Sequence, residues 1–166
     1  ELLAGKRNCA CGRDHLCPID AVVIGKGACE SLGRLTEGYS KILVVADRNT
    51  YAVGGRQVCG QLGKKAYDVL VYDDAGVLVP NEAAIARLRS HLRADADLIV
   101  GIGSGVINDL CKHVSFEAGL PYFIVATAPS MDGYASKGAA LILDGMKVTL
   151  NAAVPKAIIA DENILK

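Results

Sequence analysis

Short apolar runs alternate along the chain with segments whose apolar residues recur at helical spacing. Runs that are apolar at successive positions predict strands buried on both faces of a sheet. "KILVVAD", "LIVGIG" and "AVVIG" are of this kind. We predict strands at 21–25, 41–47, 67–73, 98–103, 122–127 and 156–161.

The intervening segments predict helices. Asn81 can cap a helix, and the helix 105–118 ends with the stop signal Gly119 and Pro121. Residues 27–37 and 50–65 also have helical spacing, although four glycines weaken the second of these predictions. This alternation predicts a Rossmann-like α/β fold, a mainly parallel sheet with helices on both faces.

Near the C-terminus the pattern changes to two strand-like runs in "AALILDGMKVTLNA". The Asp144-Gly145 pair between them predicts a β-hairpin. The final "ENILK" resembles the start of another element, so we expect residues 1–166 to be one domain of a longer protein.

Candidate ligand-binding residues follow strands, as expected for open α/β sheets. The first is "GIGSGVIND" (101–109), where glycines allow close backbone approach and a helix N-terminus can attract a phosphate. Ser104 can cap that helix or bind the phosphate, and Asp109 suits the helix dipole. A plain strand-to-helix turn remains the alternative.

Asp47 ends the second predicted strand and could accept hydrogen bonds from a ribose, or could merely cap the next segment. Its neighbour Arg48 could accommodate a 2′-phosphate, so the sequence does not decide between NAD and NADP as the cofactor. "TAPSMDGYAS" (127–136) concentrates polar side chains in a loop after a buried strand, which indicates ligand contact or a well-bonded structural loop.

Cysteines and histidines offer a further candidate. "CACGRDHLC" contains Cys9, Cys11, His15 and Cys17, which are zinc-ligand types, but their spacing matches no standard zinc module. Free thiols in a terminal segment are the favoured interpretation. His91 and His113 are expected to be surface histidines.

Composition excludes several classes of function. The formal net charge is zero and like charges do not cluster, so we expect no nucleic-acid or membrane partner. Neither a signal peptide nor a membrane span is apparent. Of the six cysteines, three lie within nine residues near the start and three are scattered, which indicates free thiols in a reducing cytoplasm.

Three segments, "GSGVINDLCKH", "ATAPSMDGYASKGAALI" and "PKAIIADENIL", resemble the N-terminal half of sn-glycerol-1-phosphate dehydrogenases. These enzymes belong to the iron-containing alcohol dehydrogenase and dehydroquinate synthase-like superfamily. The bacterial branch also tends to carry a segment like Cys9 to His15. The resemblance implies reduction of dihydroxyacetone phosphate with NAD or NADP as cofactor, in a homo-oligomeric enzyme.

When the motifs are matched residue by residue, the resemblance also implies roles for individual residues. Asp132 would bind the substrate, and Asp47 matches the ribose-binding carboxylate. Thr127, Ser130 and Ser136 would contact the cofactor. The residues that would hold its pyrophosphate are Gly103, Ser104, Gly105, Val106, Ile107, Asn108 and Asp109.

The resemblance further implies a helical C-terminal domain that binds a divalent metal (Zn, Ni or Fe), and this chain lacks that domain. Because the metal would polarise the ketone, we expect the chain alone to be inactive, with no catalytic or metal residue of its own. The alternatives are a glycerol dehydrogenase or dehydroquinate synthase-like enzyme, and a non-catalytic dinucleotide-binding module that ends near Lys166.

Overall fold

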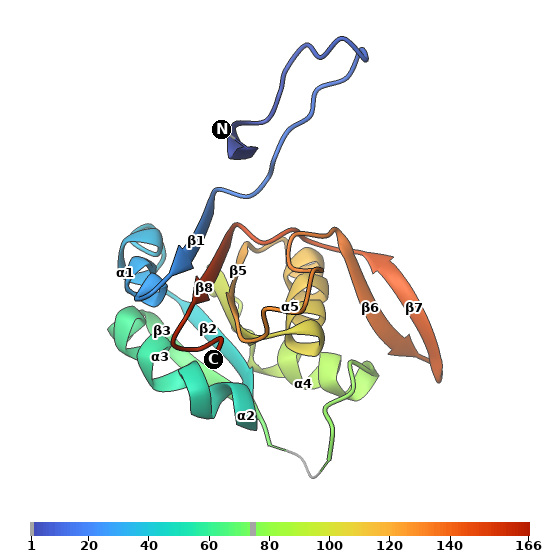
Figure 1. Cartoon of the computed structure of the whole chain (residues 1–166). Coiled ribbons are helices and arrows are strands. Elements are labelled where there is room, and N and C mark those ends of the chain that lie inside the picture. Colours follow the sequence, from blue (N-terminus) through green and yellow to red (C-terminus); the bar gives the residue numbers. More distant parts are fainter. Residues whose placement is uncertain (1, 74–75) are drawn as a thin grey trace.

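A six-stranded parallel sheet forms the centre of the molecule (Figure 1). The computed structural model describes residues 2–73 and 76–166, apart from the side chain of Leu2. The strand order is β1-β8-β5-β4-β2-β3, and every pairing is parallel. The predicted parallel sheet is therefore confirmed. Its strands are β1 (Ala21–Gly25), β2 (Ile42–Asp47), β3 (Ala66–Tyr72), β4 (Leu98–Gly103), β5 (Tyr122–Ala126) and β8 (Ala157–Asp161).

Burial differs between the centre and the edge of this sheet. β4 and β5 are buried along their whole length and β2 is buried up to Asp47, as predicted. The prediction of a buried strand at 21–25 was wrong, because β1 is an edge strand that pairs only with β8. Its outward side chains Val22 and Ile24 are 40% and 74% exposed.

Helices cover both faces, as predicted. α1 (Ser31–Leu35) and α3 (Arg56–Leu62) bury apolar side chains against one face. α4 (Glu82–His91) and α5 (Gly105–Ala118) cover the other. Successive residues of β2 alternate between the two apolar clusters, because side chains in a strand point to opposite faces.

The segment 50–65 is less regular than the single helix predicted for it. It follows α2 (Arg48–Thr50) and consists of a π-helical turn η3 (Tyr51–Gly55), α3 and the 3₁₀ turn η4 (Gly63–Lys65). Glycines allow close packing here, since a Cβ on Gly54 would lie 3.1 Å from Ile164 Cδ1. The predicted helix 27–37 is likewise a 3₁₀ turn, η2 (Ala28–Glu30), followed by the short α1.

The predicted hairpin is present as β6 (Gly138–Leu143) and β7 (Met146–Asn151). Asp144 and Gly145 form its turn with φ of 51° and 75°, the left-handed conformations that a two-residue turn needs. Ala139 and Leu141 of β6 pack in the same apolar cluster as α5, on one side of the sheet.

The two ends of the chain differ from the core. Residues 2–20 form an arm that projects from the body and carries the turn η1 (Leu2–Ala4) (Figure 1). At the other end, residues 162–164 form a turn rather than a new helix, with Ile164 buried. No helix in the described part of the chain is long and apolar enough to cross a membrane.

A candidate nucleotide site at the end of the sheet

The sheet changes direction between β2 and β4. From β2 the chain moves outward to β3, and from β4 it moves outward on the opposite side to β5. Neighbouring connections at such a point leave the sheet on opposite faces, so a crevice opens at the carboxyl ends of the two strands. Asp47 ends β2, and Gly103 ends β4.

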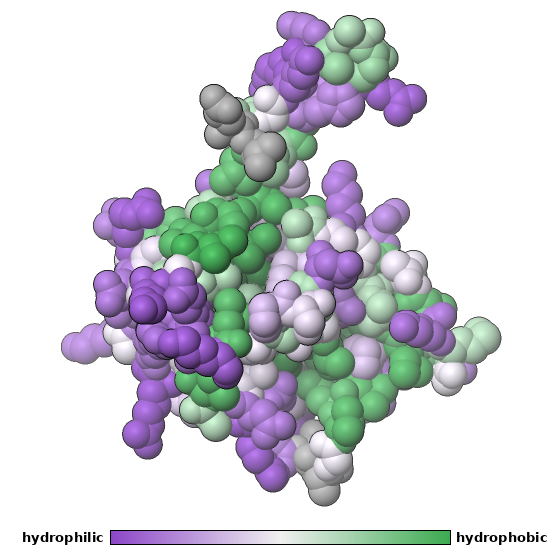
Figure 2. Space-filling model, in the orientation of Figure 1, coloured by the Kyte–Doolittle hydropathy of each residue, from purple (hydrophilic) through white to green (hydrophobic). Residues whose placement is uncertain are grey.

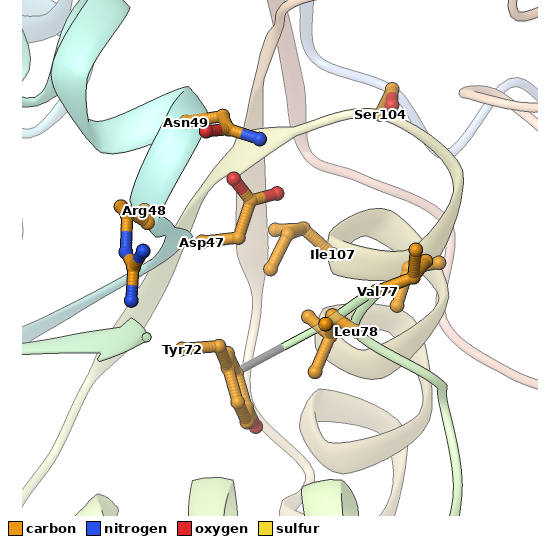
Figure 3. A pocket seen from close by; sticks show the side chains of 10 residues that line it. Asp47, Arg48, Asn49, Tyr72, Val77, Leu78, Ser104 and Ile107 are labelled. Atoms are coloured by element: carbon orange, nitrogen blue, oxygen red, sulfur yellow. The ribbon is translucent and has the colours of Figure 1, made fainter. Parts of the chain in front are cut away.

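A cavity of about 330 Å³ lies at this crevice (Figure 3). In the figure, the Asp47 side chain lies between Arg48 on one side and Ile107 and Leu78 on the other. The cavity joins the ends of β2 and β3 to the start of α5, which is the arrangement expected of a ligand crevice. Its lining residues are Asp47, Arg48, Asn49, Tyr72, Gly76, Val77, Leu78, Ser104, Val106 and Ile107.

The glycines of the β4–α5 turn have different roles. A Cβ on Gly103 would lie 2.5 Å from Ile107 Cβ, so this glycine lets the helix pack closely on the strand. A Cβ on Gly105 would meet no atom within 4 Å. Gly105 therefore leaves the helix N-terminus open to a ligand, whereas Gly103 serves the fold.

The N-terminus of α5 offers backbone donors. Ser104 is the N-cap residue, and its side chain makes no capping hydrogen bond. The first bond of the helix runs from Asn108 N to Ser104 O at 2.8 Å, so the amides of residues 105–107 precede it. Amides in this position attract anionic groups such as phosphate.

Asp47 both caps a helix and faces the cavity. Its Oδ1 accepts a hydrogen bond from Thr50 N at 2.9 Å, within a capping box that starts α2. The two alternatives raised for this carboxylate are compatible, because the residue that caps α2 also lines the cavity. Arg48 also lines the cavity and donates from Nη2 to Asp73 O at 2.6 Å.

Not every residue of the "VIND" segment faces the cavity. Val106 and Ile107 line it. Asn108 is buried, and its Oδ1 accepts a hydrogen bond from the hydroxyl of Tyr122 at 3.2 Å. Burial raises the pKa of Asp109, whose carboxylate accepts a hydrogen bond from the backbone of Ala140 in β6. These two side chains are therefore bonded to the sheet and the hairpin.

The polar loop 127–136 lies beside the same turn but does not line the cavity. Thr127 N donates to Gly103 O at 3.2 Å, which joins the start of the loop to the end of β4. Ser130 and Asp132 are exposed. The Ser136 hydroxyl contacts the carbonyls of Gly133 and Gly138, so it is part of the loop's internal bonding.

Lys112, which carried no prediction from the sequence, bonds the polar loop to α5. It is fully buried, and its Nζ donates to Gly133 O at 2.7 Å, Ser136 Oγ at 2.8 Å and Gly138 O at 3.3 Å. Burial lowers the pKa of its ammonium, while nearby Asp109 raises it. The lysine holds the polar loop against α5, and its position on the helix carried no signal of this.

The histidines of the body offer no metal site in the described part of the chain, where the one cluster of three ligand types lies in the arm. The prediction of a surface position was wrong for His113, which is 9% exposed. Its Nε2 lies 3.4 Å from Glu117 Oε1 within the same helix. His91 is half-buried.

The fold and the position of the cavity define an open α/β domain with a ligand crevice at the turning point of its sheet. Residues 23–166 match the family described as iron-containing alcohol dehydrogenase. The chain belongs to this family.

Curated relatives agree with this assignment, and a solved structure shares the fold. Glycerol-1-phosphate dehydrogenase [NAD(P)+] of Geobacillus stearothermophilus is 33% identical over 99% of this chain and 43% of its own length. The protein of that name from Bacillus velezensis is 36% identical over 89% and 39%. The chain thus spans about two fifths of the length of these relatives. An alcohol dehydrogenase from Oenococcus oeni shares the fold, with a TM-score of 0.77 at 17% identity over 89% of this chain and 45% of that one.

Proposed function

We propose that this chain is the N-terminal, dinucleotide-binding domain of a glycerol-1-phosphate dehydrogenase that reduces dihydroxyacetone phosphate with NAD(P)H. The cavity at the turning point of the sheet, with an open helix N-terminus and a carboxylate in its wall, is the observation that carries the proposal. The relatives' printed names support the substrate class. All six cysteines are free thiols, which favours a cytoplasmic location.

The residues present fit a dinucleotide. The amides of 105–107 would hold the pyrophosphate, because Gly105 leaves that approach clear. Asp47 would accept hydrogen bonds from the adenosine ribose, and Arg48 beside it could face a 2′-phosphate. Asn108 and Asp109 would act by fixing the helix rather than by touching the cofactor.

The polar loop would serve the reacting end of the site. A bound reduced nicotinamide supplies a hydride for a carbonyl carbon. Thr127, Ser130 and Ser136 would orient the nicotinamide, and the exposed carboxylate of Asp132 would accept a hydrogen bond from the substrate. Lys112 holds the loop in place through hydrogen bonds to Gly133 O and Ser136 Oγ.

Polarising the substrate ketone would require groups from outside this chain. In the described residues, the ligand types that lie close enough to share an ion are in the N-terminal arm, and none of them lines the cavity. We therefore propose that the divalent metal of the complete enzyme is bound elsewhere in a homo-oligomeric parent protein. The chain alone should bind dinucleotide without turnover.

Replacing Gly105 with leucine tests the proposal. The side chain would enter open space at the helix N-terminus, so the fold should survive while NADH affinity falls by about tenfold or more. Gly60→Leu is the matched control, because a Cβ on Gly60 in α3 also meets no atom within 4 Å. Titration calorimetry of both variants and the unchanged chain gives the comparison. Unchanged NADH affinity in Gly105→Leu would refute the site.

Asp47→Asn tests the ribose contact separately. Asparagine is also a good N-cap, so α2 should keep its start while the negative charge is lost. We expect NADH binding to weaken by about tenfold and NADPH binding to weaken less, since a phosphate no longer faces a carboxylate. Equal loss for both cofactors would show that Asp47 does not face the ribose.

A further inference from the structure

Three side chains with metal-binding atoms meet in the N-terminal arm. The thiols of Cys9 and Cys11 and the ring of His15 place one ligand atom each within 4.8 Å of the others. Cys11 Sγ lies 3.1 Å from His15 Nε2. This cluster belongs to no part of the nucleotide site.

The backbone of the arm is folded around these groups. Lys6 and His15 form an antiparallel bridge with two hydrogen bonds of 2.7 Å. Inside the bridge, Gly12 N donates to Cys9 O at 2.9 Å, and Gly12 adopts a φ of 77°, which favours glycine. The turn brings Cys11 back toward His15, so the juxtaposition is set by local hydrogen bonds.

This hairpin lies outside the apolar core of the domain. None of residues 3–16 is part of either apolar cluster of the domain. Figure 2 shows that the arm projects from the body with mostly hydrophilic side chains around a small pale-green patch. Small units without an apolar core commonly need a metal or a disulfide to stay folded, and these thiols are free.

Metal binding requires both cysteines in their deprotonated form, and both thiols are free to provide it.

We propose that Cys9, Cys11 and His15 bind one Zn²⁺ ion that staples the hairpin. Two thiolates and an imidazole are the ligands that zinc prefers, and tetrahedral geometry places such atoms about 3.6 Å apart. Cys11 and His15 are exposed and Cys9 is half-buried, and their ligand atoms already lie within 4.8 Å of one another. The Cys17 thiol instead faces Ile19 O at 3.9 Å, so the fourth position is left for water.

The test uses the whole chain, reduced and stripped of metal by a chelator. Zinc should bind with one-to-one stoichiometry, and Co²⁺ as a probe should give the charge-transfer absorption of thiolate ligands. Cys11→Ser and His15→Gln should each weaken zinc binding by about tenfold or more. Cys17→Ser is the matched control and should stay within about threefold of the unchanged chain.

Limited proteolysis gives a second readout, because trypsin can cut after Arg7 and Arg13 inside the hairpin. Zinc should slow these cuts in the unchanged chain and in Cys17→Ser, but not in His15→Gln. Since the hairpin lies outside both apolar clusters, the far-ultraviolet circular dichroism of all variants should stay alike. The proposal is overturned by absence of stoichiometric zinc, by binding that survives both ligand substitutions, or by equal loss in Cys17→Ser.

Discussion

The β4–α5 turn and the N-terminal hairpin both gather chemically capable groups, but different forces hold them. The turn rests on two fully buried strands and on a helix packed against them, so its backbone donors are fixed by the core. The hairpin relies on a few backbone hydrogen bonds, and none of residues 3–16 is part of either apolar cluster. A packed sheet can thus present bare backbone to a ligand, whereas an isolated hairpin needs side chains and a bound ion.

Of the changes that test this comparison, Gly103→Val should have the largest effect. Its Cβ would overlap Ile107 Cβ, a branched atom next to the backbone that cannot rotate away. We expect a loss of about 3 kcal/mol in the free energy of unfolding, as for an overpacked core. Urea denaturation measures it. Gly60→Val is the control, because that site is open, and similar losses in both variants would contradict a packing role for Gly103.

Lys112→Met should have the next largest effect. The variant keeps the length of the side chain but removes a cation that donates to Gly133 O, Ser136 Oγ and Gly138 O. Leaving these acceptors without their donor should cost about 2 kcal/mol in the free energy of unfolding. Hydrogen exchange should accelerate in loop 127–136 more than in β4. Uniform acceleration across the domain would argue against a specific anchor for the loop.

Asp161→Asn tests a buried carboxylate at the end of β8. Burial acts to raise the pKa of Asp161, but N–H groups of Cys29 and Asn163, among other donors, bring it below its usual value. A lowered folded-state pKa contributes stability that is present above the unfolded value and is lost as the pH falls through the folded value. Asp161→Asn should therefore cost about 1 kcal/mol at pH 7 and progressively less in acid. Thermal unfolding between neutral and strongly acidic pH checks this, and a pH-independent difference would contradict it.

The sequence predicted the central sheet well because two-sided burial leaves continuous apolar runs, as in "LIVGIG". It did not separate centre from edge, since "AVVIG" is also a continuous apolar run, although β1 lies at the edge of the sheet and Ile24 is 74% exposed. In the broken helix at 50–65, Gly54 packs so closely that a Cβ on it would lie 3.1 Å from Cδ1 of distant Ile164. Such tertiary contacts leave no periodic signal.

The candidate site was also predictable only where it does not depend on tertiary contacts. Asp47 and the glycine turn were predicted as candidates because ligand-binding groups follow strands in this class of sheet, and the structure places Asp47 in the wall of the cavity. Buried Lys112 was missed because a lysine on a helix predicts a solvated face, and only the polar loop that folds over it makes the position interior. The sequence showed the residue types of the cluster in the arm but not how they are arranged. The folded hairpin brings their ligand atoms together.

Removing residues 1–16 should have the smallest effect on the domain. Because none of residues 3–16 packs in either apolar cluster, the free energy of unfolding of the sheet should change by no more than about 0.5 kcal/mol, with or without zinc. Urea denaturation followed by circular dichroism measures the change, and NADH titration of the shortened chain should give unaltered affinity. A larger loss of stability would mean that the arm supports the sheet, and the separation between a core-held turn and an ion-held hairpin would no longer hold.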